Sequence, residues 1–272
     1  MYFYKLQGAG NDYIFVDCFD NSIDDKSKLA IKMSDRHFGI GGDGVIFLYP
    51  SFTADVRMRM FNSDGSEGAM CGNAVRCIGR LFYDNYAKAN VTVETNSGIK
   101  TVSYDEEKDL FTVNMGKPTF SDEINKPIFV SGKQYNYTFV NMGNPHCVIF
   151  VSDVKRIKRA TMEAIQSHSF FPGGINVEFV QIAEDGLNVR VCERGSGETL
   201  SCGTGACAAV AASVKCGLLQ PKSEVKVSLL GGDLIVKYSE NIYLTGNAEK
   251  VYEGDYYDKV HFCNRWSCKR TW

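Results

Sequence analysis

The 272-residue sequence lacks the features that mark nucleic-acid-binding, membrane-spanning and secreted proteins. Its 30 lysine and arginine residues are balanced by 32 aspartate and glutamate residues, so the formal charge of −2 favours neither nucleic acid nor an acidic membrane surface as a partner. No uninterrupted apolar run approaches the length of a membrane span. Residues 1–6 alternate as a strand does, without the basic stretch and long apolar core of a secretory signal.

The ten cysteines lack the spacing of a structural zinc site, because the sequence contains no C-x2-C pair. A secreted disulfide framework is also disfavoured in a chain of this length without a secretion signal. The glycine-rich stretch 39–44 lacks the lysine of a P-loop, which excludes nucleotide binding there. We therefore expect a cytoplasmic enzyme with reduced thiols and no metal.

Two of the cysteines stand in segments that match each other. Residues 67–74 and 198–205 both read Glu, three residues, Cys-Gly, a polar residue and a small residue, and a helical stretch follows each. Cys71 and Cys202 are therefore expected to begin helices, where unpaired N–H groups and the helix dipole favour a thiolate and lower the thiol pKa. Facing one small anionic substrate, two such thiols could serve as base and acid and invert a stereocentre.

Other landmarks recur in the same order at offsets of 131 to 134 residues, as Cys71 and Cys202 do. Positions 10–11 resemble 143–144, positions 41–42 resemble 173–174, and positions 91–93 resemble 225–227. Chance similarity between glycine-punctuated strands is the alternative, but the constant order favours an internal duplication. We predict an α+β fold of two pseudo-symmetric domains, residues 1–117 and 118–263, each a mixed β-sheet or barrel around a central helix. The tail, 264–272, could return to the first domain.

The remaining pattern is dominated by short strands bounded by Gly, Asn and Asp. The expected strands include 13–16, 45–49, 56–60, 110–113, 147–151, 177–182, 187–191 and 234–238. A helix is expected through 75–86, which is apolar on one face, and another through 206–215, which is apolar all round and must therefore be buried. Gly217 would cap the second helix. Surface helices are expected at 27–33 and 154–166.

Polar residues near the cysteine motifs form a second group of candidates. His146 follows a turn, although a lone histidine is more often structural. Glu193 and Arg194 end the strand before the second motif, where they could bind an amino acid or form a surface ion pair. Asparagines at strand ends and loops are common in turns, but at duplicated landmarks they could line a polar pocket. These asparagines are Asn11, Asn62, Asn144 and Asn176. Ordinary burial is expected for Cys18, Cys77, Cys147, Cys192, Cys207 and Cys216.

Taken together, the motifs resemble those of the diaminopimelate epimerases, a family of pyridoxal-phosphate-independent amino-acid epimerases. The resemblance follows the family's order over nearly the whole chain and is highly specific. It rests on Gly8 with 10–12, 35–36 with 39–41, 61–62 with 64–67, 70–73 with 76–77, 142–146, 176–177, 193–195, and 197–200 with 202–206. Departures are small: Ala74 replaces a usual Gly, Ser201 a common Ala, and Gly44 a Gln of some members, which leaves that contact in doubt.

The resemblance implies two α/β domains that close on the substrate, with Cys71 and Cys202 as the acid–base pair and His146 and Glu193 supporting the thiols. The reacting carboxylate would bind backbone amides of Gly72, Asn73, Gly203 and Thr204. The remaining substrate contacts would come from Asn11, Asn62, Asn144, Asn176, Glu193 and Arg194. The implied reaction interconverts LL- and meso-diaminopimelate in lysine and peptidoglycan-precursor biosynthesis, and we expect a homodimer. We expect no cofactor either, because no lysine lies in the cysteine motifs to form a Schiff base.

Two alternatives remain open from the sequence. The first is a related cofactor-independent racemase acting on proline, hydroxyproline or another amino acid. The asparagines and the Glu193–Arg194 pair argue for a substrate with a second zwitterionic end, which proline lacks. The second is a thiol–disulfide redox protein that uses Cys71 and Cys202, although the chain contains no C-x-x-C motif.

Overall fold

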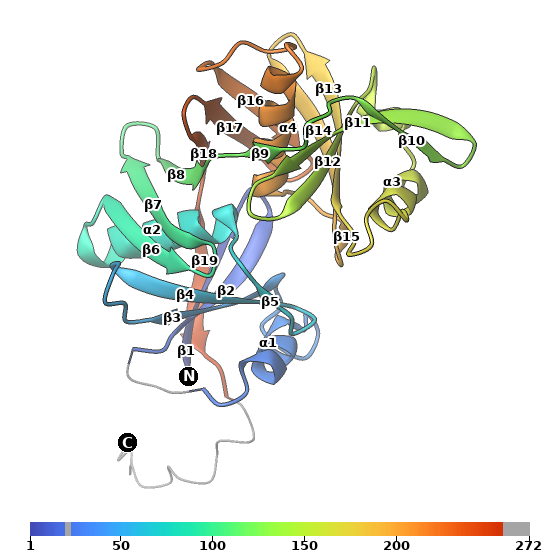
Figure 1. Cartoon of the computed structure of the whole chain (residues 1–272). Coiled ribbons are helices and arrows are strands. Elements are labelled where there is room, and N and C mark those ends of the chain that lie inside the picture. The colour runs from blue at the N-terminus through green and yellow to red at the C-terminus, as the bar shows by residue number, and fades with distance from the viewer. Residues whose placement is uncertain (20–22, 258–272) are drawn as a thin grey trace, which may run out of the picture.

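The computed structural model describes residues 1–19 and 23–257 and shows a strand-rich α+β protein of two lobes (Figure 1). The first lobe contains β1 (Tyr2–Gly8), β2 (Asn11–Asp17), β3 (Gly44–Tyr49), β4 (Val56–Asn62), β5 (Glu67–Gly68), β6 (Asn90–Thr95), β7 (Gly98–Asp105) and β8 (Leu110–Gly116). Its helices are α1 (Lys26–Ser34) and α2 (Gly72–Tyr86). The α+β prediction is thereby confirmed.

The second lobe follows with β9 (Thr119–Phe120), β10 (Lys126–Val130), β11 (Lys133–Asn141), β12 (Pro145–Phe150), β13 (Asn176–Ala183), β14 (Gly186–Glu193), β15 (Gly197–Glu198), β16 (Glu224–Leu229), β17 (Gly232–Tyr238) and β18 (Ile242–Gly246). Its helices are η1 (Val154–Arg156), α3 (Arg159–Gln166) and α4 (Gly203–Lys215). The expected helix 154–166 is thus broken into a 3-10 turn and a short α-helix around Ile157 and Lys158.

The strand pairings follow the same order in the two lobes. In the first lobe β2 pairs parallel with β3, β3 antiparallel with β4, and β4 parallel with β6. In the second lobe β12 pairs parallel with β13, β13 antiparallel with β14, and β14 parallel with β16. This recurrence is what an internal duplication would produce. The duplication itself and the boundary at residues 117 and 118 stay predictions.

Two strand pairings join the lobes. β18 pairs antiparallel with β8 of the first lobe, placing Leu244 opposite Val113. The chain then enters β19 (Glu249–Asp255), which pairs antiparallel with β1. The chain therefore returns to the first lobe at β19. From the sequence, this return was expected of the tail, residues 264–272, which follows β19. Residues 258–272, which include that tail, lie outside the described residues.

Each lobe surrounds one long helix, α2 or α4, and this arrangement places the two cysteine motifs. α2 buries one face, including Val75, Ile78 and Leu81, against β1, β7 and β8. α4 is buried from Gly203 to Ser213, as its all-apolar pattern predicts. It ends at Lys215 with Cys216 as its C-cap residue, one position before the predicted Gly217, whose φ of +72° suits a residue without Cβ. No helix of the described residues is long and apolar enough to cross a membrane.

Candidate active site

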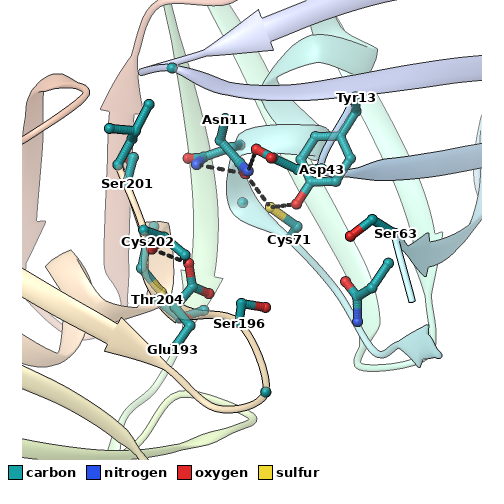
Figure 2. A pocket seen from close by; sticks show the side chains of 18 of the residues that line it. Asn11, Tyr13, Asp43, Ser63, Cys71, Glu193, Ser196, Ser201, Cys202 and Thr204 are labelled. Atoms are coloured by element: carbon teal, nitrogen blue, oxygen red, sulfur yellow. Dashed lines mark hydrogen bonds between the residues drawn. The ribbon is translucent and has the colours of Figure 1, made fainter. Parts of the chain in front are cut away.

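A cavity of about 710 Å³ lies between the lobes, and both predicted cysteines line it. Figure 2 shows Cys71 and Tyr13 on the first-lobe side, facing Cys202, Thr204 and Glu193 of the second lobe. The chain brings both motifs there because each cysteine is the N-cap residue of its lobe's central helix, Cys71 for α2 and Cys202 for α4. The helix N-termini therefore open into a shared space.

The two helix starts converge on a single side chain, Leu244 of β18. A Cβ added to Gly72 would lie 2.9 Å from Leu244 Cδ2, and one added to Gly203 would lie 2.9 Å from the same atom. Real Cβ atoms do not approach carbon so closely, so Leu244 would have to move if either glycine gained a side chain. Glycine directly after each cysteine therefore lets both helix starts lie against Leu244.

Cys71 is held by two groups from β2. The Tyr13 hydroxyl donates to Cys71 Sγ over 3.4 Å, and Asn11 Oδ1 accepts from the thiol over 3.6 Å. Asn11 also accepts from the Asn73 amide at 3.2 Å and donates to Asp43 at 2.6 Å. Because a carboxylate only accepts, Asp43 turns the Asn11 oxygen toward the sulfur. This geometry suits a protonated Cys71.

An ion network on the first lobe fixes this asparagine. Arg36 binds Asp12 through both terminal nitrogens, at 3.0 and 2.7 Å, and reaches Asp43 at 3.0 Å. Lys5, which is buried, lies 2.7 Å from Asp12. Burial alone would raise the pKa of Asp12, but the hydrogen bonds from Arg36 and Lys5 hold it below its usual value. Asp12 therefore stays charged and anchors the backbone beside Asn11.

Cys202 is buried and receives two donors from its own helix. Gly205 N–H donates to Cys202 Sγ at 3.3 Å, and the Thr204 hydroxyl lies 3.4 Å from the same sulfur. The charge of Glu193 disfavours a Cys202 thiolate, whereas hydrogen bonds from Thr199 and Cys202 favour the Glu193 carboxylate; the Thr199 hydroxyl donates to it over 2.6 Å. Burial raises the pKa of Glu193. These contacts place one carboxyl group beside the second thiol.

The thiol pKa values differ from the expectation of a thiolate near neutral pH. Burial raises the pKa of Cys71, although the Tyr13 hydroxyl and backbone N–H groups act against it. Burial, together with Glu193 and Glu178, raises the pKa of Cys202 well above its ordinary value. The prediction of a lowered pKa was wrong, because desolvation outweighs the donors of the helix start.

The other predicted residues lie at different depths around the cavity. Asn62 and Asn73 line it, and so does Asn144, which contacts Thr204. His146 is fully buried behind the cavity, with Nδ1 2.7 Å from Glu178 Oε1 and Nε2 3.0 Å from Asn144 Oδ1. The structure therefore does not place His146 against either sulfur.

Asn176 and Arg194 do not line the cavity in this structure. Asn176 donates to the Pro145 carbonyl at 2.9 Å and accepts from Arg194 N–H at 2.9 Å, so it ties the start of β12 to the residue after β14. The Arg194 side chain is exposed and lies along Gly174. Arg194 stands in the sequence between the lining residues Glu193 and Gly195.

Three neighbours of the site were not singled out from the sequence: Tyr13, Asp43 and Glu178. Tyr13 lies two positions after Asn11 on one strand, and Glu178 two positions after Asn176 on another. Residues two apart on a strand point to the same face, so this alternation was the available signal. Asp43 offered no such signal, because its contact with Asn11 arises from the parallel pairing of β2 and β3. No cluster of three or more potential metal ligands occurs within 1–19 and 23–257.

Comparison with known proteins identifies the family. The profile described as "Diaminopimelate epimerase" matches residues 3–121 and 138–251. The chain belongs to the diaminopimelate epimerase family. A relative of that name from Acetivibrio thermocellus is 45% identical over 94% of this chain and 98% of its own length. Another, from Methanococcus maripaludis, is 43% identical over 94% and 99%.

Solved structures show the same fold in more distant proteins. A hydroxyproline epimerase from Agrobacterium vitis, with bound trans-4-hydroxy-L-proline, aligns with a TM-score of 0.71 and 15% identity, covering 93% of this chain and 90% of its own. A probable proline racemase from Agrobacterium radiobacter aligns with a TM-score of 0.75 and 13% identity, covering 96% and 94%. At this identity the likeness concerns the fold alone.

Proposed function

We propose that the protein interconverts LL- and meso-diaminopimelate by two-base proton transfer at Cα. Membership of the family supports the substrate and the reaction. The observation that carries the mechanism is the pair of Cys-Gly helix starts, Cys71–Gly72 and Cys202–Gly203, facing one cavity. Thiols from two lobes can approach opposite faces of one carbon, as inversion requires.

In the proposed reaction one cysteine, as thiolate, removes the Cα proton while the other, as thiol, donates a proton to the opposite face. The electron pair left at Cα is delocalised into the reacting carboxylate as the proton leaves. Backbone N–H groups of Gly72, Asn73, Gly203 and Thr204, at two helix N-termini, would bind that carboxylate and stabilise its growing charge. Each turnover leaves the two cysteines with exchanged protonation states, so reversal restores the starting form.

The far end of the substrate carries a second ammonium and carboxylate. Asn62, Asn144 and Glu193 line the cavity and offer acceptors and donors of the required kind. Arg194 is exposed, and we infer that the loop after β14 turns inward when substrate binds. The Arg194 guanidinium would then contact the distal carboxylate. Asn176 would hold that loop through its hydrogen bond with the Arg194 backbone. Asn11 would act on the reacting side, through its contact with Cys71.

Three further assignments belong to the same proposal. The enzyme works in the cytoplasm, within lysine and peptidoglycan-precursor synthesis. It acts as a homodimer. It needs no cofactor, because the motifs contain no lysine for a Schiff base and the two helix N-termini take over stabilisation of the carbanion.

The deciding experiment incubates the purified enzyme in deuterated water with LL- or meso-diaminopimelate and follows the isomer ratio and deuterium at Cα. We expect epimerisation with deuterium in the product, and no change in the oxidation state of the thiols. Cys71→Ser and Cys202→Ser should each lose most turnover, since a serine hydroxyl is far harder to ionise than a thiol. L-Proline and trans-4-hydroxy-L-proline serve as comparison substrates. Near-normal epimerisation by either variant, or faster turnover of a proline, would contradict the proposal.

A further inference from the structure

Glu178 is a buried carboxyl group that the proposed reaction does not use. It lies on β13, is fully buried, and does not line the cavity. Its Oε1 lies 2.7 Å from His146 Nδ1, whereas Oε2 has no hydrogen-bond partner among the described residues. Burying a carboxyl group is costly unless its partner compensates for the lost water. The burial of Glu178 therefore needs an explanation.

A continuous series of contacts leads from this carboxyl group to Cys202. His146 Nε2 lies 3.0 Å from Asn144 Oδ1, and Asn144 Nδ2 lies 3.3 Å from Thr204 Oγ1. Thr204 Oγ1 lies 3.4 Å from Cys202 Sγ. We call the four residues Glu178, His146, Asn144 and Thr204 the relay. Its far end is buried, and its near end touches a sulfur that lines the cavity.

The hydrogen-bond partners give the relay a direction. An ionised Glu178 only accepts, so His146 Nδ1 carries a hydrogen. The Asn144 oxygen also only accepts, so the relay requires a hydrogen on Nε2 as well. Asn144 donates through Nδ2 to Thr204, which leaves the threonine hydroxyl hydrogen free to point at Cys202. In this arrangement every hydrogen bond of the series can be donated toward the sulfur.

The surrounding backbone is shaped to fit the relay. A Cβ on Gly205 would lie 2.8 Å from Glu178 Oε1, so the first turn of α4 rests on the carboxyl group only because residue 205 is glycine. The parallel register of β12 and β13 pairs His146 with Asn176, two residues before Glu178. Glu178 therefore sits directly beneath the helix start that carries Cys202.

We propose that Glu178 is a positioning residue for Cys202, acting through His146, Asn144 and Thr204 to keep a hydroxyl donor on the sulfur. The charge of Glu178 itself disfavours a Cys202 thiolate, and the hydroxyl donor of Thr204 acts against that effect. Glu193 is the other charged group that faces Cys202. The inference rests on the proposed function in one respect, that Cys202 exchanges a proton with substrate.

The test is the rate of iodoacetamide alkylation at Cys202 in the free enzyme between pH 7 and 9, followed by peptide mass spectrometry. This readout does not depend on turnover, so it succeeds or fails separately from the epimerase assay. Glu178→Gln keeps the shape but lets His146 become neutral, and Cys202 should then react roughly tenfold more slowly, the cost of one hydrogen bond to a charged group. Cys71 in the same molecules is the internal control and should keep its rate.

Variants at Thr204 show whether Glu178 acts through the relay. Thr204→Val removes the hydroxyl and should slow Cys202 as much as Glu178→Gln does, whereas Thr204→Ser keeps the hydroxyl and should restore the rate. In the Glu178→Gln/Thr204→Val double variant, Cys202 should react no more slowly than in Thr204→Val alone, because Thr204→Val already removes the contact between the relay and the sulfur.

Several outcomes would overturn the proposal. Faster alkylation of Cys202 in Glu178→Gln would mean that Glu178 acts only as a nearby negative charge. Equal slowing of Cys71 and Cys202, or additive effects in the double variant, would mean a general structural role. Nitrogen NMR of wild-type protein adds a readout that needs no variant: both ring nitrogens of His146, one of four histidines, should carry hydrogen at pH 7. A neutral ring would refute the relay even if Glu178→Gln fails to fold.

Discussion

Replacing Tyr13 by phenylalanine isolates one donor to a reacting sulfur. The Tyr13 ring is buried in the core that contains α2 and α4, and its hydroxyl donates to Cys71 Sγ over 3.4 Å. Phenylalanine keeps the ring and its packing, so Tyr13→Phe removes the donor without opening a large cavity. Burial raises the pKa of Tyr13 well above its usual value, so the hydroxyl stays protonated and available as a donor across the working pH range.

The size of the effect follows from the difference between two hydrogen bonds. A bond to a neutral thiol contributes about 1 kcal/mol, and a bond to a charged thiolate about 1.5–3 kcal/mol. The difference is about 1 kcal/mol, or somewhat less than one pKa unit. Tyr13→Phe should therefore raise the pKa of Cys71 further and lower kcat/KM at pH 7 by roughly five- to tenfold, while protein stability falls by about 1 kcal/mol at most.

The assay combines epimerisation in both directions with alkylation of the free enzyme. Because the equilibrium constant between the isomers is unchanged, kcat/KM must fall by the same factor from LL- and from meso-diaminopimelate. Alkylation should slow at Cys71 and not at Cys202, which provides the control within each molecule. An unchanged pH dependence of Cys71 alkylation, or equal slowing at both cysteines, would show that the hydroxyl does not support the Cys71 thiolate.

Three further predictions follow from the site. Because burial holds the pKa of both thiols above the ordinary value of 9.0, thiolate is scarce at neutral pH, and kcat/KM should rise about tenfold per pH unit from pH 6 toward 9; a plateau beginning at pH 7 would contradict this. Mild oxidation should yield an inactive form with a Cys71–Cys202 disulfide. The disulfide should form faster as pH rises, be reversed by reductant and be hindered by bound diaminopimelate. If peptide mapping finds no cross-linked peptide and activity is insensitive to oxidant, the sulfurs do not face each other. Gly203→Ala should destabilise the protein by about 1–3 kcal/mol in urea unfolding, because the new Cβ meets Leu244 Cδ2 at 2.9 Å. In the Leu244→Ala background the same substitution should cost less, and an equal cost in both backgrounds would refute the close approach to Leu244.

Local sequence patterns predicted the helices that carry the site. The all-apolar stretch 206–215 had to be buried wherever the chain placed it, and α4 is buried from Gly203 to Ser213. The apolar face of 75–86 correctly placed Val75 and Ile78 inward, but Tyr86 at the end of the same face is exposed. The stretch 154–166 was harder, because its basic cluster gave no inward face, and the chain breaks there between η1 and α3. Periodicity predicts best where burial is strongest.

Residue roles that depend on contacts between distant parts of the chain were harder to predict from the sequence. Tyr13 reaches Cys71 from a strand 58 positions earlier in the chain, and Glu178 reaches His146 from 32 positions later. The alternation along each strand places Tyr13 on the face of Asn11 and Glu178 on the face of Asn176, but it does not say which distant side chain either one meets. The sequence also favoured a lowered thiol pKa from the helix starts alone, whereas the depth of burial raises it.

The sequence by itself determined the α+β class, the helix starts at Cys71 and Cys202 and the glycine that follows each, because propensity, periodicity and chain order are properties of neighbouring residues. The tertiary structure decided that both starts converge on Leu244, that Tyr13 and Thr204 supply the hydroxyl donors, and that desolvation opposes the thiolates. Those features depend on which distant segments pack together and exclude water from the site. Strand register and the packing of the two lobes determine this, and neither can be derived from neighbouring residues alone.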